Sequence, residues 1–285
     1  GFRSTASFTG SVELTQKVAG ALNVTVDADE TATADTAIDT GAATVVATNA
    51  TSVNAVFDTA FKAGIAGEIA LGDNVATLNL TANDAAAVSI VSGGALANNV
   101  LNLTSTDVEA VTITGASKLT LTTTNAADLM NIDALAMTGS LVVSTAAVGD
   151  TGTIKLGSGA DVVTVAASSD ATGIESILSF EKTAAVAVSA VVADATAAAA
   201  AQADADVISF GGAAAVADAN VVAGGTIGTK GVLTFTGAGP SDLGSAIAIA
   251  NLAADAVGEV VVFEYLGNSY VFQQAATDIV VRLTG

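Results

Sequence analysis

The stretch from Leu78 to Leu156 decides the fold, because the same short phrase returns four times within it. The four versions are Leu78-Asn-Leu-Thr, Leu101-Asn-Leu-Thr, Leu119-Thr-Leu-Thr and Leu141-Val-Val-Ser. Their first leucines lie roughly 18 to 23 residues apart, a spacing typical of stacked repeats. The sequence therefore predicts a repeat architecture for this region.

Each repeat also contains a second short run in which every other residue is apolar. These runs are Val88-Ser-Ile90, Val111-Thr-Ile113, Met130-Asn-Ile132 and Ile154-Lys-Leu156. A two-residue period places alternate side chains on opposite faces of a strand. One such unit is too small to bury its own apolar face, whereas stacked units share a core and pair their backbone groups. We expect an all-β fold whose main part is a parallel β-helix or β-solenoid.

Two other folds stay open. A leucine-rich repeat has a similar period and contains Leu-x-Leu, but its return segment is normally helical. Here the return segments, such as Val111-Thr-Ile113, alternate like strands, which favours the solenoid. An ordinary β-sandwich of alternating strands is the second alternative.

The composition fits a thin core with many turns. Apolar residues make up 51% of the chain but aromatic residues only 4%, and there is no tryptophan. The apolar share therefore comes largely from Ala, Val, Leu and Ile. One proline and 28 glycines suit a chain that turns often without losing the hydrogen bonds between its strands.

The charge argues against two classes of partner. The formal net charge is −20, so a nucleic-acid phosphate backbone or an anionic membrane surface would be repelled. The longest apolar run, 184–193, is too short to span a bilayer, and we expect no membrane insertion. This much like charge destabilises a compact state unless cations lie among the carboxylates.

The residue types also argue against an enzyme. The chain has neither cysteine nor histidine, which excludes Cys/His zinc sites, cysteine nucleophiles and the common Ser-His-Asp triad. Lys118 and Lys155 are the only basic residues of the clear repeats, and we interpret both as solvated surface residues rather than as catalytic bases.

We divide the chain into three parts. Residues 1–68 hold N-terminal strands and an acidic connection, with room for the first solenoid coils. Residues 69–182 form the solenoid repeats, and residues 183–285 form a small α+β region that caps the solenoid or serves assembly. Its expected elements are a strand at 232–235, a helix, a hairpin of 259–266 and 268–273 about Gly267-Asn268, and a strand at 278–283. We expect Pro240 and Ser241 to open the helix and Gly258 to stop it. One face of the helix is formed by Leu243, Ile247, Ala250 and Ala254.

Three further segments have weaker signals. The acidic connection is interpreted as a solvated loop rather than a calcium site, because no glycine-punctuated motif frames its acids Asp27, Asp29, Glu30, Asp35 and Asp39. Asp58 and Asp194 suit the N-caps of a short helix to Lys62 and an alanine-rich helix to Ala205. Residues 185–192 are expected to form a strand.

Gly157-Ser-Gly159-Ala-Asp161 resembles the nonapeptide of RTX proteins, whose parallel β-roll binds calcium. The resemblance implies a calcium site with the carbonyl oxygens of Gly157 and Gly159 and the side chain of Asp161. Asp150 is our candidate ligand from the neighbouring coil. The sequence departs from the motif, because Leu156 stands where the first glycine belongs and no tandem copy follows. A simple β-turn is the alternative. Asp206 lacks preceding glycines, and we interpret it as structural.

Taken together, these motifs resemble the C-terminal portion of RTX-type, type I-secreted bacterial surface-layer (S-layer) proteins. The likeness spans roughly residues 70–285. Its carriers are the Leu-x-Leu-Thr repeats, Asp133-Ala-Leu-Ala-Met-Thr-Gly-Ser-Leu-Val-Val, Val262-Phe-Glu-Tyr-Leu-Gly-Asn-Ser-Tyr-Val-Phe and Asp278-Ile-Val-Val-Arg-Leu-Thr-Gly. The family implies secretion to the cell surface, calcium-dependent folding, and assembly into a two-dimensional lattice anchored to lipopolysaccharide through other regions of the protein.

Three functions stay open on the sequence. The first is a structural, self-assembling segment of a surface layer, and the second is an adhesin stalk or receptor-binding module of an RTX exoprotein. The third, a β-helix polysaccharide lyase, would use calcium with an Arg or Lys base and normally also aromatic platforms for sugar, which the repeats lack. We favour the first.

Overall fold

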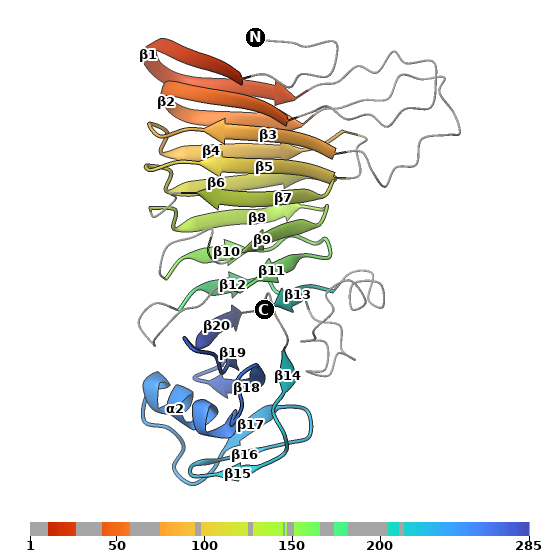
Figure 1. Cartoon of the computed structure of the whole chain (residues 1–285), viewed down its shortest axis with the longest axis vertical. Helices are drawn as coiled ribbons and strands as arrows, with labels where there is room; N and C mark the ends of the chain where they lie inside the picture. The colour runs from red at the N-terminus through yellow and green to blue at the C-terminus, as the bar shows by residue number, and fades with distance from the viewer. Residues whose placement is uncertain are drawn as a thin grey trace, which may run out of the picture. The chain divides into compact units, whose positions relative to one another are not determined.

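The computed structural model describes residues 11–26, 42–57, 75–94, 98–124, 128–144, 146, 151–165, 174–181, 205–210 and 214–284. In these ranges the chain is mostly β, with one short helix, α2 (Leu243–Ala253) (Figure 1). The expected all-β class is confirmed. The chain divides into two compact units, 1–143 with 157–159 and 144–156 with 160–285, and each is described by itself.

The first unit consists of strands that pair in parallel and alternate between two columns. One column holds β3, β5, β7 and β9, the other holds β4, β6 and β8, and the long β2 pairs with both β3 and β4. β1 pairs in parallel with β2. The bounds are β1 (Ser11–Val26), β2 (Ala42–Phe57), β3 (Val75–Thr81), β4 (Ala87–Ser92), β5 (Asn98–Thr104), β6 (Ala110–Gly115), β7 (Leu119–Thr124), β8 (Asn131–Met137) and β9 (Leu141–Ser144).

The leucines of the repeats stack on one another, although the starts of the repeats are not all aligned. Leu78 pairs with Leu101, and Leu101 pairs with Leu121. The repeat start predicted at Leu119 is therefore two residues out of step, because Leu119 pairs with Asn99. A shift of two residues preserves the side-chain alternation, so the leucines remain on the inner face.

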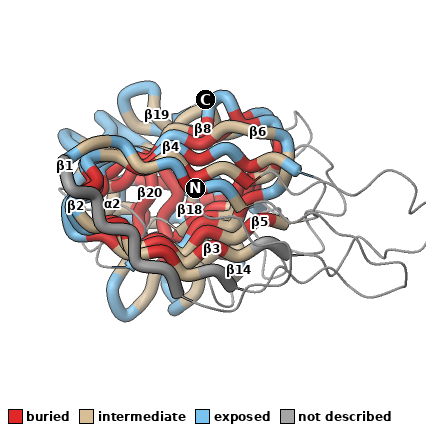
Figure 2. The backbone as a smooth tube through the Cα atoms, turned by 90° about the horizontal axis from the view of Figure 1, so that it is seen from above, coloured by how far each residue is buried: buried red, intermediate tan, exposed pale blue. Residues whose placement is uncertain are grey.

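The core of this unit lies between the two columns. Strand β5 alternates between buried and half-buried positions along its whole length, and Leu101 and Ile113 are fully buried. Seen from above, buried positions lie on the inside, between β3 and β5 on one side and β4, β6 and β8 on the other (Figure 2). Burying one such side chain contributes about 1.5–3 kcal/mol.

The parallel pairing of these strands contradicts the alternative of an antiparallel sandwich. The return segments are strands rather than the helices expected of a leucine-rich repeat.

The second unit begins with short parallel pairs and ends in an α+β region. β10 pairs with β12, β12 with β20, and β11 with β13, all in parallel. The bounds are β10 (Thr153–Lys155), β11 (Val162–Thr164), β12 (Ser176–Leu178), β13 (Val207–Ser209), β14 (Ala215–Val216), β15 (Val221–Val222), β16 (Gly225–Ile227), β17 (Val232–Phe235), β18 (Glu259–Tyr265), β19 (Asn268–Gln273) and β20 (Ile279–Thr284).

The predicted C-terminal hairpin is present as the antiparallel pair β18 and β19. Phe263 faces Tyr270, and their rings stack with centroids 5.3 Å apart. The predicted turn is displaced by one residue. Leu266 and Gly267 form it, with φ of 49° and 79°, and Asn268 already belongs to β19. Two successive positive φ values match the twist of the flanking strands.

The ends of helix α2 differ from those predicted. Asp242, not Pro240 or Ser241, is the N-cap, and its carboxylate accepts a hydrogen bond from Ser245 N at 2.6 Å. The predicted stop at Gly258 is wrong, since the helix ends at Ala253. Ala254 then takes an extended conformation and is fully buried in the C-terminal core.

The predicted face of α2 is confirmed at Ala250, and the predicted Ala254, just beyond the helix, is also fully buried in the core. Ala246, Ala250 and Ala253 are the buried residues of the helix, whereas Leu243 and Ile247 are half-buried at the margin of the core. Small side chains let a helix approach its neighbours closely, so an alanine face can be the contact face although leucine and isoleucine are more apolar.

Several predictions fall outside the described residues. They are the acidic connection at 27–39, the helix at 58–62, the helix at 194–205 except for its last residue Ala205, which is described and not helical, the strand at 185–192, and the domain boundaries at 68/69 and 182/183. They stay predictions. Among the described helical residues, none belongs to a helix with the length and apolar character needed to cross a bilayer.

Candidate functional site

The turn 157–159, proposed to supply calcium ligands, makes close backbone contacts in the first unit. Ser158 N donates to Met137 O at 3.0 Å. A Cβ atom on Gly157 would lie 2.1 Å from Met137 O, and one on Gly159 would lie 2.4 Å from Gly139 O. Only glycine allows two backbones to approach this closely. The two glycines therefore have a structural reason that needs no ion.

Asp161, the proposed carboxylate ligand, lies in the second unit and is fully buried. Its backbone N–H donates to Asp206 Oδ1 at 3.0 Å, and its carbonyl oxygen accepts from Val207 N at 2.8 Å. These bonds join the start of β11 to the start of β13. The backbone of Asp161 is thus fixed by hydrogen bonds to Asp206 and Val207.

Asp206 connects two turns through its carboxylate. Besides the bond from Asp161 N, its Oδ2 accepts from Glu181 N at 2.6 Å, and only 7% of the residue is exposed. Burial raises the pKa of Asp206 to about 7, against the lowering effect of the two backbone hydrogen bonds; the charges of Asp161 and Glu181 raise it further. The contacts agree with the structural role predicted for Asp206. Its bridging role was missed, because it depends on residues 25 and 45 positions away.

The described residues of the proposed calcium set are Gly157, Gly159 and Asp161. Gly157 and Gly159 belong to the first unit, Asp161 to the second, and Asp150 lies outside the described residues. In the described ranges no three or more Asp, Glu, His or Cys side chains are grouped as metal ligands would be. Both oxygens of Asp206 already accept backbone N–H groups. Calcium at this turn stays a prediction that depends on Asp150.

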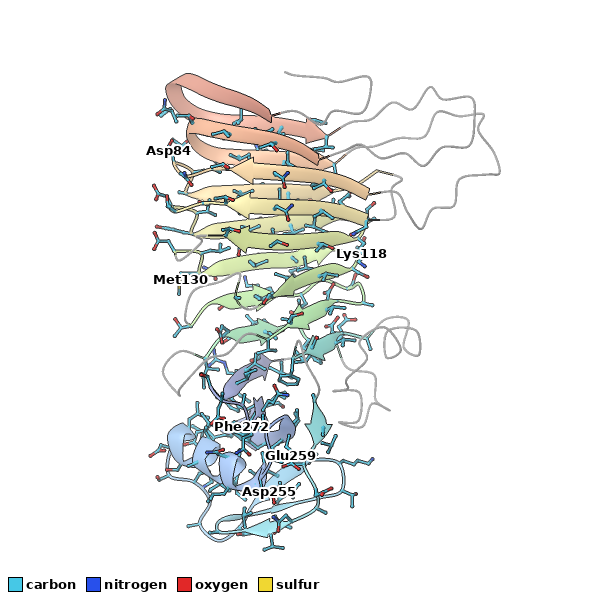
Figure 3. All side chains as sticks on the ribbon, in the orientation of Figure 1. Asp84, Lys118, Met130, Asp255, Glu259 and Phe272 are labelled. Carbon is cyan, nitrogen blue, oxygen red and sulfur yellow. The ribbon has the colours of Figure 1, made fainter. Side chains whose placement is uncertain are left out.

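A second acidic feature runs along the turns that leave β3, β5 and β7. We call Asp84, Asp107, Glu109 and Asp128 the acidic edge, and all four are exposed. Backbone hydrogen bonds stack these turns, with Glu109 N on Ala86 O at 2.9 Å and Met130 N on Glu109 O at 3.0 Å. Figure 3 shows Asp84 and Met130 along one edge of the unit and Lys118 along the other. Carboxylates on stacked turns repel one another, and cations in solution reduce this repulsion.

Polar side chains are also stacked on the outer surface of the first unit. Asn102 Nδ2 donates to Asn79 Oδ1 at 2.7 Å, and Asn79 Nδ2 donates to Thr44 Oγ1 at 3.4 Å. Asn54 Nδ2 donates to Asn23 Oδ1 at 2.8 Å in the other column, where Asn54 pairs with Ser89 of β4. The sequence signal for the row of Asn79 and Asn102 was the asparagine repeated in Leu-Asn-Leu-Thr.

The basic residues Lys118, Lys155 and Arg282 occupy different surroundings. Lys118 is exposed and Lys155 is half-buried. Arg282 is half-buried and donates from Nε to Ser176 Oγ at 3.0 Å, across the pair β12 and β20. The Arg282 contact joins two strands of the fold.

No family model, curated protein or solved structure matches this chain. The features that bear on the function are the parallel columns, the acidic edge and the stacked polar rows of the first unit.

Proposed function

We propose that the first unit is a β-solenoid and that the chain is a structural segment of a bacterial surface layer. In this proposal the protein is secreted by the RTX type I route and assembles with itself at the cell surface. The observation that carries the proposal is the parallel stacking of β2 to β9 in two columns, with leucine placed over leucine.

Such stacking suits a structural element for two reasons. The backbone N–H and C=O groups of each coil form hydrogen bonds with the coils above and below it. An irregular coil would leave such groups on its neighbours unpaired and so destabilise them as well. The outward side chains repeat at the strand spacing of about 4.8 Å, which gives a regular surface. Regular, stiff surfaces are what a two-dimensional lattice needs from its subunits.

The proposed role of calcium follows from the negative charge of the chain. A chain of net charge −20 with an exposed acidic edge resists the approach of a second copy. Divalent cations among the carboxylates reduce this repulsion, and oxygen ligands are the ones that calcium prefers. We therefore propose that assembly depends on calcium, with lipopolysaccharide anchoring left to other regions of the protein.

A calcium titration tests the proposal. The purified chain is followed by size-exclusion chromatography and electron microscopy with calcium, with magnesium, and with calcium plus chelator. We expect ordered assemblies in calcium that disperse on chelation and form poorly in magnesium. Assembly that ignores calcium and chelator contradicts the calcium dependence.

Two other outcomes would replace the proposal. A chain that stays monomeric in calcium and binds a specific glycan or protein is an adhesin stalk or receptor-binding module. Turnover of an acidic polysaccharide would instead support a lyase.

A further inference from the structure

We propose that two copies of this chain pair through the outer face of β3, β5, β7 and β9 together with the first half of β2. We call this the Thr/Asn face. Its centre is formed by Asn79, Thr81, Asn102, Thr104, Thr122 and Thr124. The inference rests on the proposed self-assembly and names the surface that would carry one of its contacts.

The geometry of this face is regular. Asn79 pairs with Asn102 and Asn102 with Thr122, while the neighbouring row is formed by Thr81, Thr104 and Thr124. None of the pairings between β2, β3, β5, β7 and β9 contains a register shift. In the other column, the pairing of β6 with β8 shifts beyond Thr112, and Leu135 is 61% exposed there. The Thr/Asn face is therefore the more even of the two.

Charge also selects this face. Strands β2, β3, β5, β7 and β9 contain no Asp, Glu, Lys or Arg. The other column carries Asp133 on β8, and the acidic edge lies on the turns. Two copies with a net charge of −20 repel each other least where the approaching surfaces carry no charge. A second copy can approach β2, β3, β5, β7 and β9 without burying a carboxylate of these five strands, and the nearest acidic position on a described strand is Glu13 of β1, which pairs with Val46 of β2.

The side chains of this face are already held in place. Asn102 donates to Asn79, and Asn79 to Thr44, at 2.7 and 3.4 Å. Thr120 Oγ1 lies 3.3 Å from Asn98 Oδ1, to which it donates. Side chains fixed before association lose less conformational entropy on binding. Threonine methyl groups between these polar atoms supply apolar contact area.

The size of the face sets the strength of the contact. Five strands about 4.8 Å apart, with outward residues over about 20 Å, give roughly 500 Å² per copy. A pair would bury roughly 1,000 Å², which is at the lower limit for a specific interface. The same face on both partners makes the contact isologous, with two-fold symmetry. A contact of this size is weak alone and is strengthened when a lattice repeats it.

A charge placed on the face tests the inference. The double variant Thr104→Glu/Thr122→Glu is compared with the control Ser89→Glu/Thr112→Glu, which puts the same two charges on exposed positions of β4 and β6 in the other column. Sedimentation velocity in calcium measures the self-association constant, and thermal unfolding checks the fold. We expect at least a tenfold loss for the double variant Thr104→Glu/Thr122→Glu and wild-type association for the control.

A second experiment does not depend on the stability of the glutamate variants. The chain has no cysteine, so a single substitution gives a unique attachment point. We expect Thr104→Cys to form cross-linked dimers with a bifunctional maleimide, and Ser89→Cys to remain monomeric.

The outcomes separate this inference from the proposed function. If all variants associate like wild type and Thr104→Cys does not cross-link, the Thr/Asn face is overturned while self-assembly stands. If the wild type never associates in calcium, the proposed function fails as well. A monomeric wild type whose binding to a glycan is lost only in Thr104→Glu/Thr122→Glu assigns the face to a polysaccharide and overturns the pairing.

Discussion

At the scale of single residues, close contacts explain what a motif alone does not. The phrase Gly157-Ser-Gly159-Ala-Asp161 predicts a turn and suggests calcium ligands. The need for glycine arises from Met137 O and Gly139 O, which the chain reaches only after folding. A sequence shows which residues permit a close approach, but the atoms that make the approach necessary lie some twenty positions away.

The first prediction concerns Gly157. Gly157→Ala should lower the free energy of unfolding by about 1–3 kcal/mol, because the new Cβ would lie 2.1 Å from Met137 O and the backbone would have to move. Urea unfolding followed by circular dichroism measures the change. Ser158→Ala is the matched control, since Ser158 is exposed, and it should stay near wild type. Equal stability of Gly157→Ala and wild type would show that the contact is not as close as described.

The second prediction concerns pH and Asp206. Its pKa is raised from 3.8 to about 7 in the folded chain, so between about pH 4 and pH 7 the folded state holds a proton that the unfolded state has lost. This group therefore stabilises the fold fully below pH 4, and its contribution is lost as the pH rises towards 7. Asp206→Asn, which does not titrate, should remove this part of the pH dependence.

The measurement for Asp206 is urea unfolding of both proteins at several values between pH 4 and pH 8, in buffer without calcium. The difference in unfolding free energy between wild type and Asp206→Asn isolates this residue from the other acids. We expect the difference to fall as the pH rises. A difference that is constant across this range rules out a raised pKa for Asp206.

At the scale of elements, the two-residue period could be predicted from the sequence, but the pairing register of the strands could not. The two-residue period correctly placed Leu101 and Leu121 in the interior, because alternation follows from the strand itself. The register could not be predicted. β5 begins with Asn98 and Asn99, before its first leucine, whereas β7 begins with Leu119 itself. Leu119 therefore pairs with Asn99 and not with Leu101. Helix α2 gives a similar result, since its predicted stop at Gly258 depended on local sequence and ignored the burial of Ala254.

The third prediction tests the inner face of β5. Leu101→Ala should destabilise the chain by about 2–5 kcal/mol, because it leaves a cavity between the two columns. Val100→Ala, on the next residue but only half-buried, should cost clearly less. Chemical unfolding of both variants provides the comparison. If Val100→Ala costs more than Leu101→Ala, the assigned faces are reversed.

At the scale of the molecule, the acidic residues are not spread evenly. Among the described residues of the first unit they lie mainly on turns, and β2, β3, β5, β7 and β9 carry none. Composition predicted strong acidity and a need for cations, but not this separation, which depends on where each strand begins and ends. An even, uncharged face beside an exposed acidic edge suits a protein that avoids contact in general and allows it on one surface.

The central claim is that the repeat strands pair in parallel within two columns, and a pair of cysteines tests it most directly. Neighbouring strands lie about 4.8 Å apart, within the range of Cα separations that a disulfide spans. In this cysteine-free chain, Asn79→Cys/Asn102→Cys should oxidise to an intramolecular disulfide in dilute, monomeric protein, whereas Asn102→Cys/Thr112→Cys, with its cysteines in different columns, should not. Mass spectrometry of the oxidised monomers gives the answer. Bridging of the second pair without the first would contradict the parallel stack.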